Sequence, residues 1–291
     1  MRFDRVAILD WSAAGSPTKG KDSIWIGVTG PDGTTAQNLP TRGLAEEALA
    51  ALIDDCLTRG QRLLLGADFN FGAPTGLAAR LTGRSEALSW WHWLAERITD
   101  TERNQTNYRQ IAAEMNLRFA GEGPFWGNGA KQQVDGLPRT KPALPDGLAE
   151  HRQTDLIGRT GGLFPKTIWQ LAGAGAVGAQ SLTGIPVFWR LRQRFRPHCG
   201  VWPFDDAQTA ITFAEIYASH VTPQVSQLES RGMVRDEAQV RLLSSSFYKL
   251  DQKGRLPALF AKPDDCAWLN DEGWTLGNGY VQSIQMAAET R

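Results

Sequence analysis

The sequence predicts an α/β protein whose sheet contains both parallel and antiparallel strands. Two uninterrupted apolar runs of strand length, residues 6–9 and 63–67, are each followed directly by an aspartate, Asp10 and Asp68. Two further strand candidates and one helical segment lie between them, which gives the order β-β-β-α-β. The simplest placement of the fourth strand is parallel to the first, across a right-handed crossover.

The first strand leads into a hairpin. After a polar loop that contains glycine, residues 23–28 are rich in β-branched and aromatic side chains, as strands are. Pro31-Asp32-Gly33 predicts a turn, and residues 34–38 predict a short third strand that runs antiparallel to the second.

A helix connects this hairpin to the fourth strand. From Leu44 to Gly60 the apolar residues recur at helical spacing, and glycine commonly follows the last turn of a helix. The fourth strand then ends at Asp68.

Residues 76–200 are predicted to form a large helical insertion. Residues 121–166 are rich in glycine and proline, which indicates a long surface excursion that a compact domain tolerates mainly for a functional reason. The three tryptophans of residues 90–93 are expected to pack the insertion on the sheet. Helices are expected over residues 85–99, 107–118, 166–181 and 187–195.

The carboxyl-terminal part returns to the sheet. Residues 209–216 predict a late strand with Glu215 near its end, and residues 236–250 predict a helix with one apolar face. We therefore expect a single domain over residues 1–291, with its core in residues 1–75 and 201–291.

Composition limits the classes of function. Thirty-one Lys and Arg balance thirty-one Asp and Glu, which argues against a protein that coats nucleic acid by bulk charge. We expect a cytoplasmic protein without membrane contact, because neither a spanning apolar run nor a secretory signal is visible. Cys56, Cys199 and Cys266 lie far apart, so neither a disulfide framework nor a zinc site is indicated.

Three short acidic motifs lie at the ends of predicted elements. They are Ile8-Leu9-Asp10-Trp11-Ser12, Gly66-Ala67-Asp68-Phe69-Asn70-Phe71-Gly72 and Arg235-Asp236-Glu237-Ala238-Gln239. Together with the hairpin and the helix, they resemble an uncharacterised bacterial family of predicted nucleases with a ribonuclease H-like fold. The likeness covers the two ends of the chain, about half of it. It implies a ribonuclease H-like five-stranded mixed sheet with helices on both faces, and a nuclease that requires Mg²⁺ or Mn²⁺.

Position by position, the resemblance implies that Asp10, Asp68 and Asp236 are metal ligands and catalytic residues. Asp10 would bridge two ions, and Asp68 and Asp236 would each hold one. Glu215 or Glu237 would be a fourth acid.

The chain departs from the family pattern at two positions. Gln239 stands where related sites carry a second acid on the last helix, and Asn70 stands where the family often has proline. The first departure argues against a complete two-metal site, because a neutral glutamine is a poor ligand for Mg²⁺.

Carboxylates suit the hydrolysis of a phosphodiester. The reaction needs an activated water and stabilisation of the leaving oxygen, and hard cations held by carboxylates supply both. The alternative is that Asp10 caps a loop with Ser12 and that Asp236 is only the N-cap of its helix.

Basic and hydroxyl side chains could steady the phosphate. Residues 131–200 contain ten Lys or Arg and four acids, and Arg binds phosphate in a forked geometry, although a solvated basic face explains such a run equally well. The expected phosphate-binding residues are Ser12, Lys19, Lys166, Arg190 and Arg194.

Other functions stay open. A loop after Asp10 could clasp nucleotide phosphates as in actin-like ATPases, but the chain has no second loop of this kind. Gly173-Ala174-Gly175-Ala176-Val177-Gly178 matches the dinucleotide-binding fingerprint, but the segment before it is a poor strand, so we predict a small-residue helix there. The leading hypothesis is a metal-dependent phosphodiester hydrolase that acts on nucleic acid or a nucleotide. The alternatives are a nucleotide- or cofactor-processing enzyme, as in pterin or corrin metabolism, and a catalytically silent binding protein.

Overall fold

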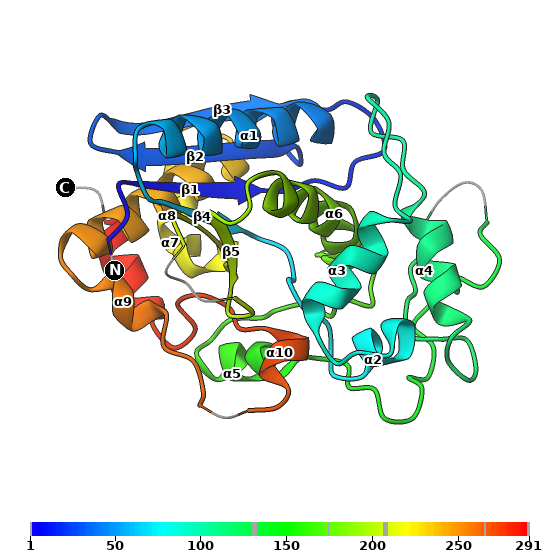
Figure 1. Ribbon diagram of the computed structural model, residues 1–291. Coiled ribbons are helices and arrows are strands. Elements are labelled where there is room, and N and C mark those ends of the chain that lie inside the picture. Colours follow the sequence, from blue (N-terminus) through cyan, green and yellow to red (C-terminus); the bar gives the residue numbers. More distant parts are fainter. Residues whose placement is uncertain (1, 130–132, 174, 206–208, 265, 290–291) are drawn as a thin grey trace.

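The computed structural model describes residues 2–129, 133–173, 175–205, 209–264 and 266–289, and within them six strands form one mixed sheet (Figure 1). The strand order across the sheet is β3-β2-β1-β4-β6-β5. The strands are β1 (Arg5–Asp10), β2 (Ile24–Gly30), β3 (Gly33–Leu39), β4 (Leu63–Ala67), β5 (Cys199–Trp202) and β6 (Ile211–Glu215).

The pairing confirms the predicted placement of the first and fourth strands. β1 and β4 are parallel neighbours, with Leu9 opposite Ala67, so Asp10 and Asp68 follow at the same edge of the sheet. β2 and β3 add the antiparallel hairpin, and β6 pairs parallel with both β4 and β5. The sheet has one strand more than predicted, because β5 has only four residues and is too short to show a periodic pattern.

Helices are predicted over residues 44–60, 85–99, 107–118, 187–195 and 236–250, and the structure has a helix in each of these ranges, together with others that the sequence does not predict. The helices before β5 are α1 (Arg42–Thr58), α2 (Leu77–Thr82), α3 (Ala87–Ala95), α4 (Tyr108–Asn116), α5 (Gln153–Thr160) and α6 (Gly178–Arg194). Those after β6 are the 3₁₀ helix η1 (Ala218–Val221), α7 (Thr222–Glu229), α8 (Arg235–Gln252), α9 (Leu256–Leu259), α10 (Leu269–Glu272) and α11 (Val281–Ala288).

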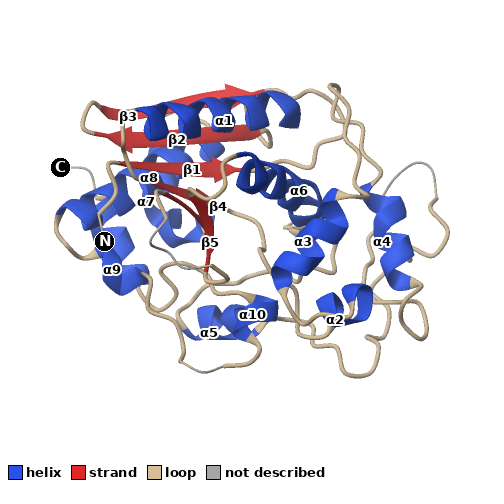
Figure 2. Cartoon of the chain, in the orientation of Figure 1, coloured by secondary structure: helices blue, strands red, loops and turns tan. Residues whose placement is uncertain are grey.

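The sheet separates two apolar layers. Successive residues of a strand point to opposite faces, so Leu9 packs on the side of α1 and α6, whereas Ile8 packs on the side of α8 and α11. Figure 2 shows α1 on one side of the upper strands and α8 on the other. The carboxyl end of β1 points toward α6 and the helical insertion.

The insertion shares its core with the sheet. Trp90, Trp91 and Trp93 are buried in the same cluster as Leu9 and Phe213, which confirms that the tryptophans pack the insertion on the sheet.

The predicted helix over residues 166–181 is wrong. Residues 166–177 are irregular where the structure describes them, and α6 begins only at Gly178 and runs without interruption through Pro186. Gly173 and Gly175 have φ angles of 99° and 72°, a backbone conformation that ends a regular helix. Ala174, which belongs to the same predicted helix, lies outside the described residues.

The glycine-rich excursion is not confined to the surface. It carries α5, and around the start of this helix Arg152, Thr154 and Asp155 are buried. Among the described residues, no helix has both the length and the apolar character that a membrane crossing requires.

Candidate active site

Asp10 and Asp68 form the centre of the site. Asp10 is the last residue of β1 and Asp68 follows β4 directly, so the parallel pairing brings the two half-buried carboxyl groups within hydrogen-bonding reach of each other. The backbone N–H of Trp11 donates a hydrogen bond of 2.9 Å to Asp68 Oδ1. The sequence therefore predicted correctly that these two acids meet.

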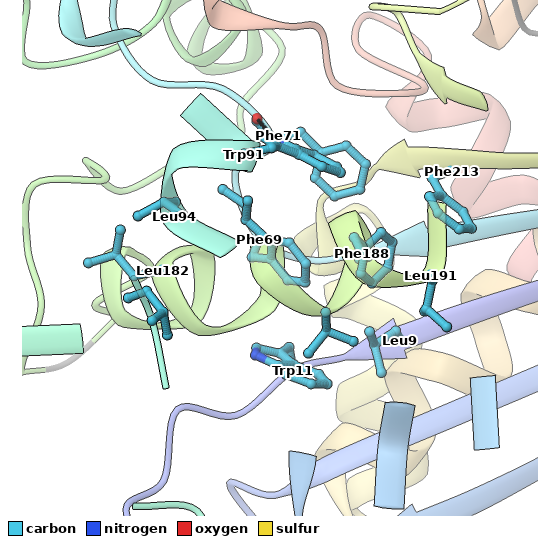
Figure 3. Packing of buried hydrophobic residues seen from close by; sticks show 14 of the residues in the cluster. Leu9, Trp11, Phe69, Phe71, Trp91, Leu94, Leu182, Phe188, Leu191 and Phe213 are labelled. Atoms are coloured by element: carbon cyan, nitrogen blue, oxygen red, sulfur yellow. Dashed lines mark hydrogen bonds between the residues drawn. The ribbon is translucent and has the colours of Figure 1, made fainter. Parts of the chain in front are cut away.

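An aromatic residue follows each acid and fixes its strand end. Trp11 and Phe69 are both 1% exposed, and their ring centroids lie 6.3 Å apart. Trp11 donates its indole N–H to Thr183 of α6 at 3.0 Å, and Figure 3 shows both rings packed against this helix beside Phe188. The backbone of α6 approaches Phe69 closely at Gly184, where a Cβ would lie 2.5 Å from the ring.

Asp236 enters the site from the first turn of α8. It is buried, and its Oδ2 accepts a hydrogen bond of 2.7 Å from the backbone N–H of Asp22. The N-cap of α8 is Val234, so Asp236 does not cap its own helix and instead holds the loop after β1. α8 lies directly on β2 because Gly27 has no side chain, and a Cβ there would lie 2.5 Å from the carbonyl oxygen of Val240.

These acids destabilise one another when they are ionised. Burial, followed by the negative charges of Asp68 and Asp236, raises the pKa of Asp10 well above its usual value. Burial raises the pKa of Asp68 to about 7, and burial also raises the pKa of Asp236. None of the three forms an ion pair with a basic side chain in the described part of the chain.

A cleft of about 560 Å³ opens over the acids. Asp22 also lines it, as a fourth acid that sequence reasoning missed because nothing distinguishes it from other polar residues of the loop. Residues 171–173, 175 and 176 and Tyr108, from the insertion, form the opposite wall.

The donor set favours a hard cation bound by few protein ligands. Among the described residues, no three His, Cys, Asp or Glu side chains are grouped closely enough to hold a metal ion together. Two carboxylates from the protein are nonetheless enough to bind Mg²⁺, because waters and substrate phosphate oxygens supply its remaining ligands. Asp10 and Asp68 fit this requirement, because they are adjacent oxygen ligands whose mutual repulsion a cation relieves.

Glu215 has a different role from the predicted fourth acid. It is buried at the end of β6, and Arg152 donates to both of its oxygens at 2.7 and 2.5 Å. The backbone N–H of Phe71 and the hydroxyl of Thr275 complete its hydrogen bonds. Since the positive charge of Arg152 already compensates this carboxylate, we replace the predicted catalytic role with a structural one. Glu237, the other candidate, forms an ion pair with Arg241 on the same helix.

Of the two expected phosphate ligands in the loop after β1, only Ser12 lines the cleft. Its hydroxyl donates to the carbonyl oxygen of Asp22 and accepts from the N–H of Ala14, so it closes the loop. Lys19 is exposed and does not line the cleft. The buried Arg42 supports the loop by donating to the carbonyl oxygens of Ser12 and Ala14, a role that no sequence signal indicated.

The predicted arginines lie away from the acids, whereas the predicted lysine lies near them. Arg190 forms a bidentate ion pair with Glu46 of α1, and Arg194 lies over the ring of Phe195 in the last turn of α6. α6 begins beside the cleft, so Arg194 lies about 20 Å further along the helix at 1.5 Å per residue. The prediction that Arg190 and Arg194 bind the phosphate is therefore wrong, because both lie outside the site. Lys166 lines a second hollow that adjoins Asp68.

Comparison of the chain with protein-family models, with curated proteins and with solved structures finds no match. The candidate site is consequently defined by the geometry of Asp10, Asp68 and Asp236 alone.

Proposed function

We propose that this protein is a divalent-cation-dependent phosphodiester hydrolase with a ribonuclease H-like core, to which β5 and residues 76–200 are additions. The observation that carries the proposal is the meeting of Asp10 and Asp68 at the ends of parallel neighbouring strands, with Asp236 facing the same cleft. Ligands of α/β sheets collect at this carboxyl edge.

Asp10 and Asp68 would hold a single Mg²⁺ or Mn²⁺. When bound, such an ion polarises a phosphoryl oxygen and lowers the pKa of a bound water. The grouping of the described acids supports one ion shared by two carboxylates better than the predicted pair of ions.

Asp236 would accept a proton from the attacking water. Its Oδ2 accepts a hydrogen bond from the N–H of Asp22, and the backbone of Ser23 provides a second hydrogen bond to the carboxylate. Burial raises the pKa of Asp236, and a base with a raised pKa accepts a proton more readily near neutral pH. The same hydrogen bonds fix the position of the carboxylate relative to the loop.

Hydrolysis of a phosphodiester panel by the Asp10→Asn variant tests this function. The panel contains bis(p-nitrophenyl) phosphate, single-stranded and duplex DNA, and RNA, each with Mn²⁺, with Mg²⁺ and with EDTA. We expect cation-dependent cleavage by the wild type and a loss of at least 100-fold in Asp10→Asn, because the substitution removes a charged cation ligand.

Asp54→Asn is the matched control. Asp54 is an exposed acid on α1, and its substitution should leave the rate within twofold. Cleavage that persists in EDTA or in Asp10→Asn contradicts the proposal, as does a wild type that cleaves no substrate with either ion.

A further inference from the structure

A second hollow of about 280 Å³ adjoins the acid cleft. It lies between the segment that follows β6 and the irregular segment before α6. The two hollows share Asp68, Gly175, Gln180 and Gln239 in their walls. A molecule with one group at the acids can therefore extend past Asp68 into the second hollow.

The second hollow offers carbon surface with a few free polar groups at its rim. Pro165, Val177 and Ala218, which are partly exposed, contribute carbon surface to its lining. Lys166, Ser219 and Gln239 also line it, and none of these side chains has a hydrogen-bond or ion-pair partner among the described residues. Apolar walls with a few polar groups are typical of sites for small organic ligands.

We infer that this hollow binds the heterocyclic ring of a nucleotide-sized phosphate ester, whose phosphate lies at Asp10 and Asp68. The inference rests on the proposed function for the position of the phosphate. The ring would lie against the apolar wall, and Ser219 and Gln239 would bond to the nitrogen and oxygen atoms at its edge.

The charges of the two hollows favour a small ester over a nucleic-acid chain. Among their described lining residues, Arg235 and Lys166 are the cations, whereas Asp10, Asp22, Asp68, Glu215 and Asp236 are acidic. Proteins that bind polymeric nucleic acid neutralise several phosphates with Lys and Arg. The described walls have too few of these residues for a polymer, but enough for one phosphate with a cation.

Calorimetric titration in the presence of Mn²⁺ tests the inference with four probes. They are adenosine 5′-monophosphate, ribose 5-phosphate, which lacks the ring, adenosine, which lacks the phosphate, and a 12-nucleotide DNA strand. We expect the nucleotide to bind at least tenfold more tightly than ribose 5-phosphate, and the DNA strand to bind no more tightly than the nucleotide.

Ser219→Trp fills the mouth of the second hollow and should remove the preference for the ring. Ser219 is exposed, so the indole does not disturb the core. Ser226→Trp, which makes the same exchange at an exposed position of α7 outside both hollows, should keep the full preference.

Four results separate the possible failures. Equal affinity for the nucleotide and ribose 5-phosphate overturns the ring site, as does a ring preference that survives in Ser219→Trp. Tighter binding of the DNA strand than of the nucleotide overturns the small-ester assignment. Equal affinity for adenosine and the nucleotide instead contradicts the proposed function, because the phosphate then adds no affinity through a cation at the acids.

Discussion

At the scale of single residues, the carboxylates of Asp10 and Asp68 repel each other and are held in fixed positions. The rings of Trp11 and Phe69 anchor the strand ends, so the two carboxyl groups cannot move apart without disrupting the core. A bound divalent cation relieves the repulsion between the two carboxylates, whereas a proton shared between them relieves it only in part. The residues that hold the pair in place therefore matter as much as the acids.

His220 provides a prediction about pH. Burial lowers its pKa to about 4, and neither ring nitrogen has a hydrogen-bond partner among the described residues. Because the folded protein binds this proton less readily than the unfolded chain, the contribution of His220 to stability is complete above about pH 6.5 and is lost as the pH falls toward 4. The wild type should therefore lose on the order of 3 kcal/mol in free energy of unfolding as the pH falls through this range, and His220→Leu should not show this loss.

Urea unfolding between pH 4 and pH 7 measures this effect. The free energy of unfolding of His220→Leu should depend less on pH than that of the wild type. His198→Leu, at an exposed position, should follow the wild type. Parallel pH curves for His220→Leu and the wild type would refute the assignment.

Arg152 provides a prediction about buried charge. It binds Asp155 and Glu215, and all three side chains are at most 2% exposed. Arg152→Met should lower the free energy of unfolding by about 3–5 kcal/mol, because it leaves two acids buried without a counter-charge. Arg59→Met, which breaks an exposed pair with Asp55, should cost less than about 1 kcal/mol. A loss of similar size in both variants would contradict the central position of Arg152.

At the scale of elements, the contact between α6 and the end of β4 positions the site. Gly184→Ala places a methyl group 2.5 Å from the ring of Phe69, so the helix or the strand end must shift. We expect a loss of about 1–3 kcal/mol in stability. The hydrolysis rate should also fall, because Asp68 precedes Phe69 directly.

Gly43→Ala is the control for this prediction. Gly43 lies in the first turn of α1, and a Cβ there meets no atom within 4 Å. The variant should retain the wild-type rate and be at least as stable, since alanine favours a helix. Unchanged stability and rate in Gly184→Ala would show that the contact does not position the acid.

Elements with strong local patterns could be predicted from the sequence. The apolar runs of β1 and β4 specify buried strands, and the spacing of apolar residues specifies α1 and α8. β5 could not be predicted, because four residues carry no period. The helix predicted over residues 166–181 was wrong, since the backbone of Gly173 and Gly175 overrides the helical pattern around them.

The same division applies to the site. Asp10 and Asp68 follow from strand topology, because the ends of parallel neighbours necessarily meet. The neutralisation of Glu215 could not be foreseen, because Arg152 precedes it by 63 residues in an irregular segment. Asp22 was missed because its position depends on a backbone hydrogen bond to Asp236, which leaves no trace in the residue pattern.

At the scale of the whole molecule, balanced charge predicts a weak response to salt. The chain has equal numbers of basic and acidic residues, and the arginines of α6 lie away from the cleft. The kcat/KM for a small phosphodiester should therefore change less than threefold between 50 and 200 mM salt. A protein that makes six or more phosphate contacts with a nucleic acid loses about 10³-fold or more in affinity over this range. A steep salt dependence for the small substrate would contradict the weak net field that the balanced charge predicts.

The central claim is that Asp10 and Asp68 hold a divalent cation between them. Anomalous scattering from a crystal soaked in Mn²⁺ tests it most directly, with an Asp10→Asn crystal treated in the same way. We expect one strong peak within about 2–2.5 Å of oxygen atoms of both carboxylates, and no peak in the variant. A manganese ion bound elsewhere in the wild type, with none between these two carboxylates, would contradict the claim.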